Sequence, residues 1–307
     1  MAHASYMDDV AHCITKKMKN RHFVILILGL SLLVIFGCKP TNVNQLFYEQ
    51  AGTGETILFI HGAQEDYRVF MPQLDLLKED YQVISYSRRY NYPMPNKYQE
   101  GIPYSTETEA EDLETLINSL KTNSVHIVGH SYGGLIAMEY THKNPDKVQS
   151  LTLSEPPLLR LSGCEQWYQA TQEGLIEKVG TAFKTNDTTQ IMKAIFEFFV
   201  GADIQDQVPP EVLQSLKANL SEMKALVNSE DPFPDLSTDF QTPVMLITTA
   251  NTMPMLKCTN EALAKKIPKA KRIHLPDASH EMWMTHPEIL STHIRDFISG
   301  IPKGINE

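Results

Sequence analysis

The sequence predicts an α/β fold in which a mostly parallel, doubly wound sheet carries an inserted helical cap. From residue 45 onward, short runs rich in Val, Ile and Leu alternate with helix-patterned segments, as in parallel strands buried on both faces. The interval from residue 158 to 241 is too long for a simple crossover and has helical patterns without a convincing strand. A chain of 307 residues, 42% of them apolar, is long enough to bury such a core.

The individual elements follow from local patterns. We expect strands over residues 56–60, 81–86, 124–128, 148–153, 243–248 and 271–275. Thr106 and Glu109 form a capping-box pattern ahead of an apolar helical face. His286 and Pro287 open the last helix, with proline in the first turn, where it is tolerated. Within the long interval, helical spacing relates Leu213, Leu216, Leu220, Met223 and Val227.

The N-terminal segment has the pattern of an export signal. Basic residues, among them Lys19 and Arg21, precede an almost wholly apolar run over residues 23–36. The run is too short to span a bilayer comfortably, since spanning takes about 20 residues. Residues 36–40 resemble the cleavage site of bacterial lipoproteins, which implies that Cys38 is acylated and anchors the protein to a membrane of the cell envelope. An uncleaved anchor helix and a plain secretory signal, which would release a secreted soluble protein, are the alternatives.

The predicted organisation is a signal segment, a core in two parts and a cap. Their ranges are residues 1–38 for the signal, 39–157 and 242–307 for the core, and 158–241 for the cap. A formal net charge of -10 argues against a nucleic-acid surface, which would need Lys and Arg to meet phosphate. No protein partner has a readable signature, so chemistry on a small molecule is the expectation.

The cysteines leave one question open. Cys13 would be removed with the signal and Cys38 acylated, so that Cys164 and Cys258 remain in the mature chain. Neither has metal-ligand spacing, and a bond between them cannot be read from the sequence. Two structural thiols are the favoured interpretation.

The most specific chemical signal follows the strand predicted to end at residue 128. Residues 129–133 read Gly-His-Ser-Tyr-Gly, which is the G-x-S-x-G form, and a helical segment comes next. Glycines flank the serine because so tight a strand-to-helix turn leaves no room for side chains beside it. Ser131 is therefore the predicted nucleophile, and its weakly nucleophilic hydroxyl requires a base and an acid that orients the base.

His280 is the predicted base, because it comes late in the chain and directly after the last strand. Other histidines fit the chain order less well. His61 and His130 belong to the turn motifs, and His126 and His274 lie within predicted strands. His142, His286 and His293 lie in predicted helices or at helix ends.

At this point the chain resembles the α/β-hydrolase fold family, from about residue 45 to its end. The resemblance includes the His61-Gly62-Ala63-Gln64 turn after one strand, the Ser131 turn, the inserted cap and the loop of His280. It implies that the backbone N–H groups of Ala63 and Tyr132 form an oxyanion hole. It implies no metal and no cofactor.

The sequence departs from the family at the acid. Most members carry an aspartate after the strand that here ends near Thr248, but the corresponding position is Thr252. Either the enzyme is impaired, or the acid has moved to the end of the preceding strand, as in some members. Glu155 stands there, at the same carboxyl edge of the sheet, followed by two prolines that fix the chain. Glu155 is therefore the predicted triad acid.

Two other interpretations of this region stay open. Glu155 could instead be a surface carboxylate or the ion-pair partner of Arg88 or Arg89, and Asp277 is a rival acid close to His280. One of the arginines could alternatively hold a substrate carboxylate, although a structural role near the nucleophile turn is favoured.

The predicted activity is hydrolysis of a carboxylic ester or related acyl bond through an acyl-enzyme on Ser131, with His280 as base and Glu155 as acid. A lactone, a thioester, an amide or a diketone C–C bond are alternative targets of the same residues. A non-catalytic member that binds a ligand beneath its cap is the alternative from another class.

Overall fold

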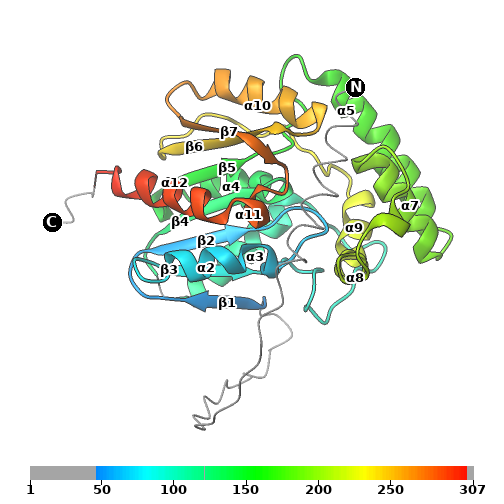
Figure 1. Cartoon of the computed structure of the whole chain (residues 1–307), viewed down its shortest axis with the longest axis horizontal. Coiled ribbons are helices and arrows are strands. Elements are labelled where there is room, and N and C mark those ends of the chain that lie inside the picture. Colours follow the sequence, from blue (N-terminus) through cyan, green and yellow to red (C-terminus); the bar gives the residue numbers. More distant parts are fainter. Residues whose placement is uncertain (1–45, 121, 303–307) are drawn as a thin grey trace, which may run out of the picture.

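The computed structural model describes residues 46–120 and 122–302. Seven strands form one sheet in the order β1-β3-β2-β4-β5-β6-β7, and β1 alone runs antiparallel to its neighbour (Figure 1). Their bounds are Tyr48–Ala51 (β1), Thr56–Ile60 (β2), Gln82–Tyr86 (β3), Val125–His130 (β4), Val148–Ser154 (β5), Val244–Asn251 (β6) and Lys271–Ser279 (β7). The predicted mostly parallel, doubly wound sheet is confirmed.

Helices cover both faces of the sheet. In β2, Leu58 and Ile60 pack into one apolar cluster and Ile57 and Phe59 into the other, because successive side chains of a strand point to opposite faces. Helices α3, α4 and α10 contribute to the first cluster, and α2, α11 and α12 to the second. Their bounds are Met71–Leu77 (α2), Thr106–Ser119 (α3), Tyr132–Lys143 (α4), Pro254–Lys266 (α10), Met282–Thr285 (α11) and Pro287–Ser299 (α12), with short helices η1 at Tyr67–Phe70 and η2 at Pro145–Lys147.

Two local features differ from the sequence prediction. Strand β1 was not predicted, because its residues do not form a continuous apolar run. They lie half-buried or exposed at the edge of the sheet. The cap of α3 is Ser105 rather than Thr106, because the Ser105 hydroxyl accepts from the Thr108 N–H at 3.1 Å. Glu109 does not close a capping box but is fully buried beside Arg88.

The helices between β5 and β6 stack on the carboxyl edge of the sheet, at the right of Figure 1. Their bounds are Glu165–Thr171 (α5), Gln172–Val179 (η3, a π-helix), Gly180–Phe183 (α6), Thr188–Phe199 (α7), Gln205–Gln207 (η4), Pro210–Ala218 (α8) and Leu220–Val227 (α9). We refer to this group as the cap. Its apolar side chains, such as Met223 and Leu226, join the same cluster as α3 and α4, so the cap and core share one packed interior.

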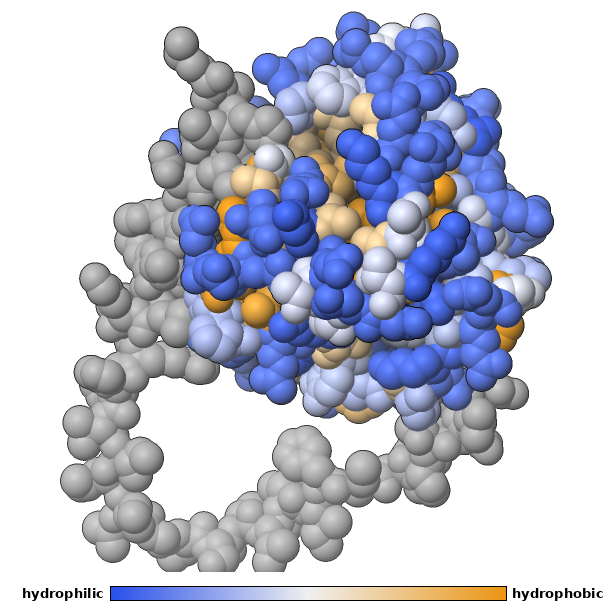
Figure 2. All heavy atoms as spheres, turned by 90° about the vertical axis from the view of Figure 1, so that its right-hand side faces the viewer, coloured by the Kyte–Doolittle hydropathy of each residue, from blue (hydrophilic) through white to orange (hydrophobic). Residues whose placement is uncertain are grey.

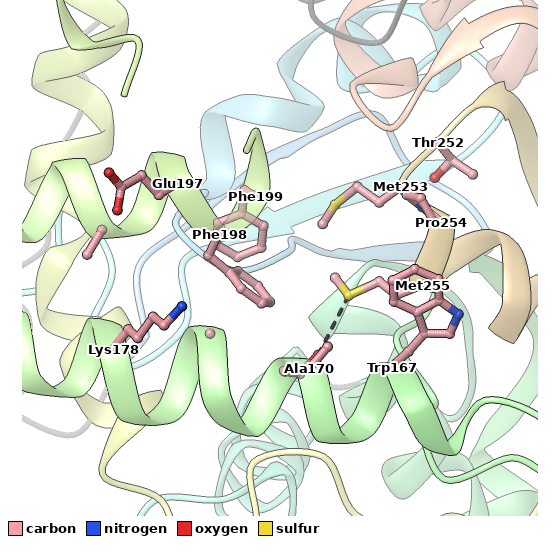
Figure 3. Close-up of a pocket in the computed structure, with 13 residues that line it drawn as sticks. Trp167, Ala170, Lys178, Glu197, Phe198, Phe199, Thr252, Met253, Pro254 and Met255 are labelled. Atoms are coloured by element: carbon pink, nitrogen blue, oxygen red, sulfur yellow. Dashed lines mark hydrogen bonds between the residues drawn. The ribbon is translucent and has the colours of Figure 1, made fainter. Parts of the chain in front are cut away.

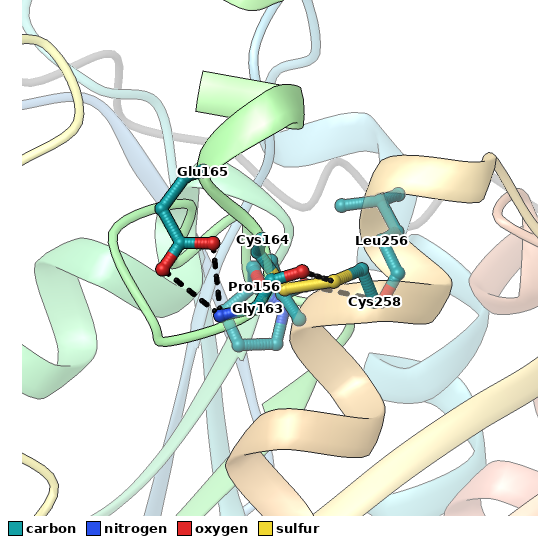
Figure 4. The surroundings of a disulfide bond; sticks show 7 residues. Pro156, Gly163, Cys164, Glu165, Leu256 and Cys258 are labelled. Carbon is teal, nitrogen blue, oxygen red and sulfur yellow. Dashed lines mark hydrogen bonds between the residues drawn. A yellow bond between two sulfur atoms is a disulfide. The ribbon is translucent and has the colours of Figure 1, made fainter. Parts of the chain in front are cut away.

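A disulfide between Cys164 and Cys258 fastens the start of the cap to α10 (Figure 4). The favoured interpretation of two structural thiols is therefore wrong. The two cysteines are 94 residues apart, and only the packing of the cap entry against α10 brings them together. Next to the disulfide, the Thr259 hydroxyl donates to the carbonyl of Pro156 at 3.0 Å.

The predicted signal segment, including Cys13 and Cys38, lies outside the described residues. Within residues 46–120 and 122–302, no helix combines the length and the apolar character that crossing a membrane requires.

Candidate active site

Ser131 occupies the tight turn between β4 and α4. Its backbone has φ 51° and ψ −124°, a conformation that L residues rarely adopt and that projects the side chain from the turn. A Cβ added to Gly129 would lie 2.6 Å from the carbonyl oxygen of Gly133, and one added to Gly133 would lie 2.3 Å from that of Ile60. The glycines are therefore required by close backbone approach. The Ser131 N–H donates to the Ser154 carbonyl at 2.9 Å, which ties the turn to β5.

The N–H groups of Ala63 and Tyr132 are available to a ligand. Among the described residues, neither N–H donates to an acceptor, whereas the N–H groups of Gly62 and Gln64, on either side of Ala63, both do. Tyr132 directly follows Ser131, and the loop of Ala63 directly follows β2, which is the strand beside β4. Free donors at these two places match the arrangement that the sequence predicted for an oxyanion hole.

The structure brings His280 and Glu155 together. Nδ1 of His280 lies 2.8 Å from Oε2 of Glu155, and the glutamate is fully buried at the end of β5. Glu155 has φ 50°, which turns its side chain across the carboxyl edge of the sheet toward the loop after β7. The two alternative interpretations of Glu155, a surface carboxylate and an ion-pair partner of Arg88 or Arg89, are therefore wrong. Asp277, the rival acid, is exposed within β7.

Thr252, which stands where the family's usual aspartate is expected, serves Glu155 instead. Its hydroxyl donates to Oε2 of Glu155 at 2.8 Å. Oε1 accepts from the N–H of Thr249 at 2.9 Å, from its hydroxyl at 2.9 Å and from the Asn260 amide at 3.3 Å. Burying a carboxyl group without hydrogen-bond partners would be costly, and these donors satisfy both of its oxygens. Position 252, where the family's aspartate is expected, thus supplies a hydrogen-bond donor to Glu155.

The surroundings of His280 raise the pKa of its imidazole. Burial alone would lower the pKa of its imidazole, but the hydrogen bond and the charge of Glu155 outweigh burial and raise that pKa above the ordinary value. Glu281 and Glu65 add to the rise. His130 lies beside it, with ring centroids 4.5 Å apart, and burial and the neighbouring His280 lower the pKa of His130 well below the usual range.

Glu65 is a site residue that the sequence analysis missed. Its Oε2 accepts from the Gly62 N–H at 2.6 Å. A Cβ added to Gly62 would lie 3.0 Å from this oxygen and 3.0 Å from Cβ of Ser131, so the carboxyl group borders the predicted nucleophile. Burial, reinforced by the charge of Glu281, raises the pKa of Glu65 to about 8. The sequence feature that could have identified Glu65 is the position of its carboxylate, three residues after Gly62 of the His-Gly turn.

The two arginines after β3 have different partners, and neither pairs with Glu155. Arg88 is fully buried and bonds Glu222 of α9 at 2.8 Å and Glu109 of α3 at 3.3 Å. Arg89 forms two hydrogen bonds with Asp112, at 2.7 and 2.8 Å, near the surface. The favoured structural role for these arginines agrees with this arrangement. Within the described part of the chain, no group of three or more His, Cys, Asp or Glu side chains is placed to hold a metal ion.

A cavity of about 620 Å³ adjoins this region between the cap and the loop after β6. Most of its walls are apolar, and aromatic and methionine side chains such as Trp167, Phe198 and Met255 contribute to them (Figure 3). Thr252, which donates to Glu155, lines one end, and Lys178 and Glu197 lie toward the other (Figure 3). The cap side of the molecule shows an apolar hollow ringed by hydrophilic residues (Figure 2).

Comparison with known proteins identifies sequences and structures that are similar to this chain. A family model described as alpha/beta hydrolase fold matches residues 55–223. A putative non-heme chloroperoxidase of Synechocystis sp. is 24% identical over 86% of this chain and 99% of that protein. A thermophilic esterase from Thermogutta terrifontis, solved with malate bound, has a TM-score of 0.67 at 23% identity, covering 84% of this chain and 94% of that one. A bromoperoxidase from Bacillus anthracis also has a TM-score of 0.67, at 22% identity, covering 84% and 98%.

Proposed function

Because this chain belongs to the α/β-hydrolase fold family and is a hydrolase, we propose that it is a serine hydrolase that cleaves carboxylic esters through a Ser131-His280-Glu155 triad. The observation that carries the proposal is the 2.8 Å contact between His280 and a buried Glu155, on the same sheet edge as the Ser131 turn. The name esterase, which one structural neighbour bears, agrees with it.

In the first half-reaction, His280 accepts the Ser131 hydroxyl proton while the serine oxygen bonds to the ester carbonyl carbon. The negative charge that develops on the carbonyl oxygen is held by the N–H groups of Ala63 and Tyr132. His280 then gives its proton to the departing alcohol as the C–O bond breaks. Glu155 stabilises the imidazolium that exists between these two proton transfers.

In the second half-reaction, water replaces the alcohol. His280 takes one proton of the water, whose oxygen attacks the acyl carbon, and returns that proton to Ser131 as the acid is released. The chemistry uses only side chains and backbone groups of this chain, so we propose no cofactor and no metal.

The cavity beside Thr252 supports an ester with a bulky apolar group. Its aromatic and methionine walls would bury such a group, and its volume of about 620 Å³ falls in the ordinary range for small-molecule sites. Thr252 lines one end of the cavity and also donates to Oε2 of Glu155, and this shared residue supports a binding site close to the proposed triad.

The nucleophile is tested with the full chain, p-nitrophenyl butyrate and a serine-directed fluorophosphonate. We expect Ser131→Ala to lose about 10⁴-fold or more in kcat and to abolish labelling, because no other group can form the acyl-enzyme. Ser299→Ala, at an exposed end of α12, is the matched control and should label like the wild type. A wild-type chain inert to both ester and fluorophosphonate would favour the non-catalytic, ligand-binding alternative.

We also propose that the protein is exported and held at a membrane of the cell envelope through a lipid on Cys38. Basic and apolar residues ahead of Cys38 support export, and so does the Cys164–Cys258 disulfide, because such bonds persist mainly in oxidising compartments. Growth with labelled palmitate tests this proposal. Label that is incorporated in the wild type and lost in Cys38→Ala supports the lipid anchor, and an unlabelled wild type contradicts it.

A further inference from the structure

We propose that the cap positions the oxyanion loop, residues 61–65, through Glu222, so that the cap contributes to binding of the transition state. Arg88 of the core is the second positioning residue. The inference rests on the proposed function, in which the Ala63 N–H binds the oxyanion, and assigns Glu222 and Arg88 a role in placing that N–H.

The cap holds Gln64, the residue after Ala63, on both sides of its backbone. Oε2 of Glu222 accepts from the Gln64 N–H at 3.1 Å, and the Asn219 amide donates to the Gln64 carbonyl at 3.2 Å. Gln64 has φ 57°, a left-handed conformation that a residue with a side chain adopts only when its surroundings enforce it. Both enforcing residues, Glu222 and Asn219, come from the cap and are fully buried.

Arg88 connects the same cap residue to the other side of Ala63. Its Nη2 donates to Oε1 of Glu222 at 2.8 Å and to the carbonyl of Gly62 at 3.0 Å. The Arg88 backbone N–H donates to Nε2 of His61 at 3.1 Å, and Nδ1 of that ring lies 2.8 Å from the same Gly62 carbonyl. The residues on either side of Ala63 are thus bonded to one buried ion pair that crosses from core to cap.

This arrangement leaves the Ala63 N–H free between two neighbours whose N–H groups have acceptors. The Gly62 N–H is taken by Glu65 and the Gln64 N–H by Glu222, so neither can compete for an oxyanion. An oxyanion hole works only if its donors are already oriented before charge develops. Removing the Glu222 carboxylate would free the Gln64 N–H and allow the Ala63 peptide to rotate.

Glu109 provides a matched control, because it is the other buried carboxylate bonded to Arg88. Only Oε1 of Glu109 has partners, Arg88 and Tyr104, and Oε2 has none among the described residues. Glu109→Gln can therefore keep both contacts while its amide takes the place of Oε2. In Glu222 both oxygens accept hydrogen bonds, so Glu222→Gln must lose one of them.

The experiment measures kcat and KM for p-nitrophenyl butyrate in the full chain, together with inhibition by an aryl trifluoromethyl ketone, whose serine adduct carries an oxyanion. For Glu222→Gln we expect kcat to fall about 10- to 100-fold with little change in KM, because a small misplacement of a catalytic group costs this much. Affinity for the ketone should fall by a similar factor. Glu109→Gln should keep kcat within about threefold of wild type.

Glu222→Asp is the second variant, in case Glu222→Gln does not fold. It keeps the charge that pairs with Arg88 but withdraws the carboxylate by one methylene, and it should show the same kcat loss without a change in KM. Equal losses in Glu222→Gln and Glu109→Gln, or a folded Glu222 variant with wild-type kcat and ketone affinity, would overturn the inference. An inert wild-type chain would instead count against the proposed function itself.

Discussion

Glu155 and Glu222 are both fully buried glutamates to which we assign roles in the proposed active site, but different kinds of group surround them. In the core, Glu155 is bonded by neutral donors from β6, the loop after β6 and α10, and by His280, and no arginine or lysine of the described chain pairs with it. In the cap, Glu222 is paired with the guanidinium of Arg88.

The difference shows how one residue type serves two tasks. Neutral hydrogen bonds hold a carboxylate in place without cancelling its charge, so Glu155 remains able to stabilise a positive imidazole. An arginine cancels the charge and fixes the geometry, which leaves Glu222 suited to bracing a loop. The comparison predicts that the charge of Glu155 matters for chemistry and that the hydrogen bonds of Glu222 matter for position.

The largest effect expected from this comparison is that of Glu155→Gln. The amide keeps the size of the side chain but removes the charge that stabilises the imidazolium, so we expect kcat for p-nitrophenyl butyrate to fall about 10³- to 10⁴-fold. Steady-state kinetics and the melting temperature are measured together. Glu261→Gln, at an exposed position of the neighbouring helix α10, should leave kcat unchanged. Near wild-type activity in Glu155→Gln would remove Glu155 from the triad.

Adding Thr252→Asp to Glu155→Gln sharpens the test. The Thr252 hydroxyl lies 2.8 Å from Oε2 of Glu155, the oxygen that contacts His280, so a carboxylate at position 252 would carry a negative charge close to His280. We expect the double variant to recover about tenfold of the lost activity, because a charged acid again faces His280. In the wild-type background, Thr252→Asp should instead lower activity, since two neighbouring carboxylates disfavour ionisation of both. A double variant as inactive as Glu155→Gln would show that an acid in this loop does not serve His280.

The next effect is on stability and concerns the disulfide that fastens the cap entry near Glu155. We expect Cys164→Ser with Cys258→Ser to lower the free energy of unfolding by about 2–4 kcal/mol, because a long loop of the unfolded chain is no longer closed. Denaturant unfolding of the oxidised wild type and of the double variant measures this difference in the free energy of unfolding. The reduced wild type should behave like the variant. Equal stability of oxidised and reduced protein would contradict a stabilising role.

The smallest expected effect concerns pH. The raised pKa of His280 means that the neutral base is lost as pH falls through a value above the ordinary one for imidazole, so the acid limb of kcat/KM should lie above about 6.5. Glu281→Gln removes a charge that raises this pKa, and the limb should then move to lower pH. Glu288→Gln, an exposed glutamate of α12, is the control and should leave the limb in place. A limb that stays fixed in Glu281→Gln would exclude this carboxylate as a neighbour that acts on His280.

Much of the fold was predictable because its signals are local. The apolar run of β2 gave its bounds directly, and Pro287 begins α12 as expected. The approach of Glu155 to His280 was also predictable, since carboxyl ends of parallel strands meet at one sheet edge.

The unpredicted contacts join residues that are far apart in the chain. Arg88 and Glu222 are separated by 134 residues, and the two disulfide cysteines by 94. Both contacts depend on how the cap packs against the core, and the helical spacing of apolar residues does not specify that packing. Glu109 was misread because a glutamate early in a helix satisfies the capping-box pattern whether it caps or is buried.

The loop after β6 carries a wider consequence. The Thr252 hydroxyl donates to Glu155, and the next three residues, Met253, Pro254 and Met255, line the cavity. Under the proposed function, the triad acid comes from the residue after β5, so this segment can change its sequence while the reacting charge stays in place. The proposal then assigns substrate preference and catalytic competence to separate stretches of the gene, and we expect mutagenesis of these three codons to alter specificity at little cost to turnover.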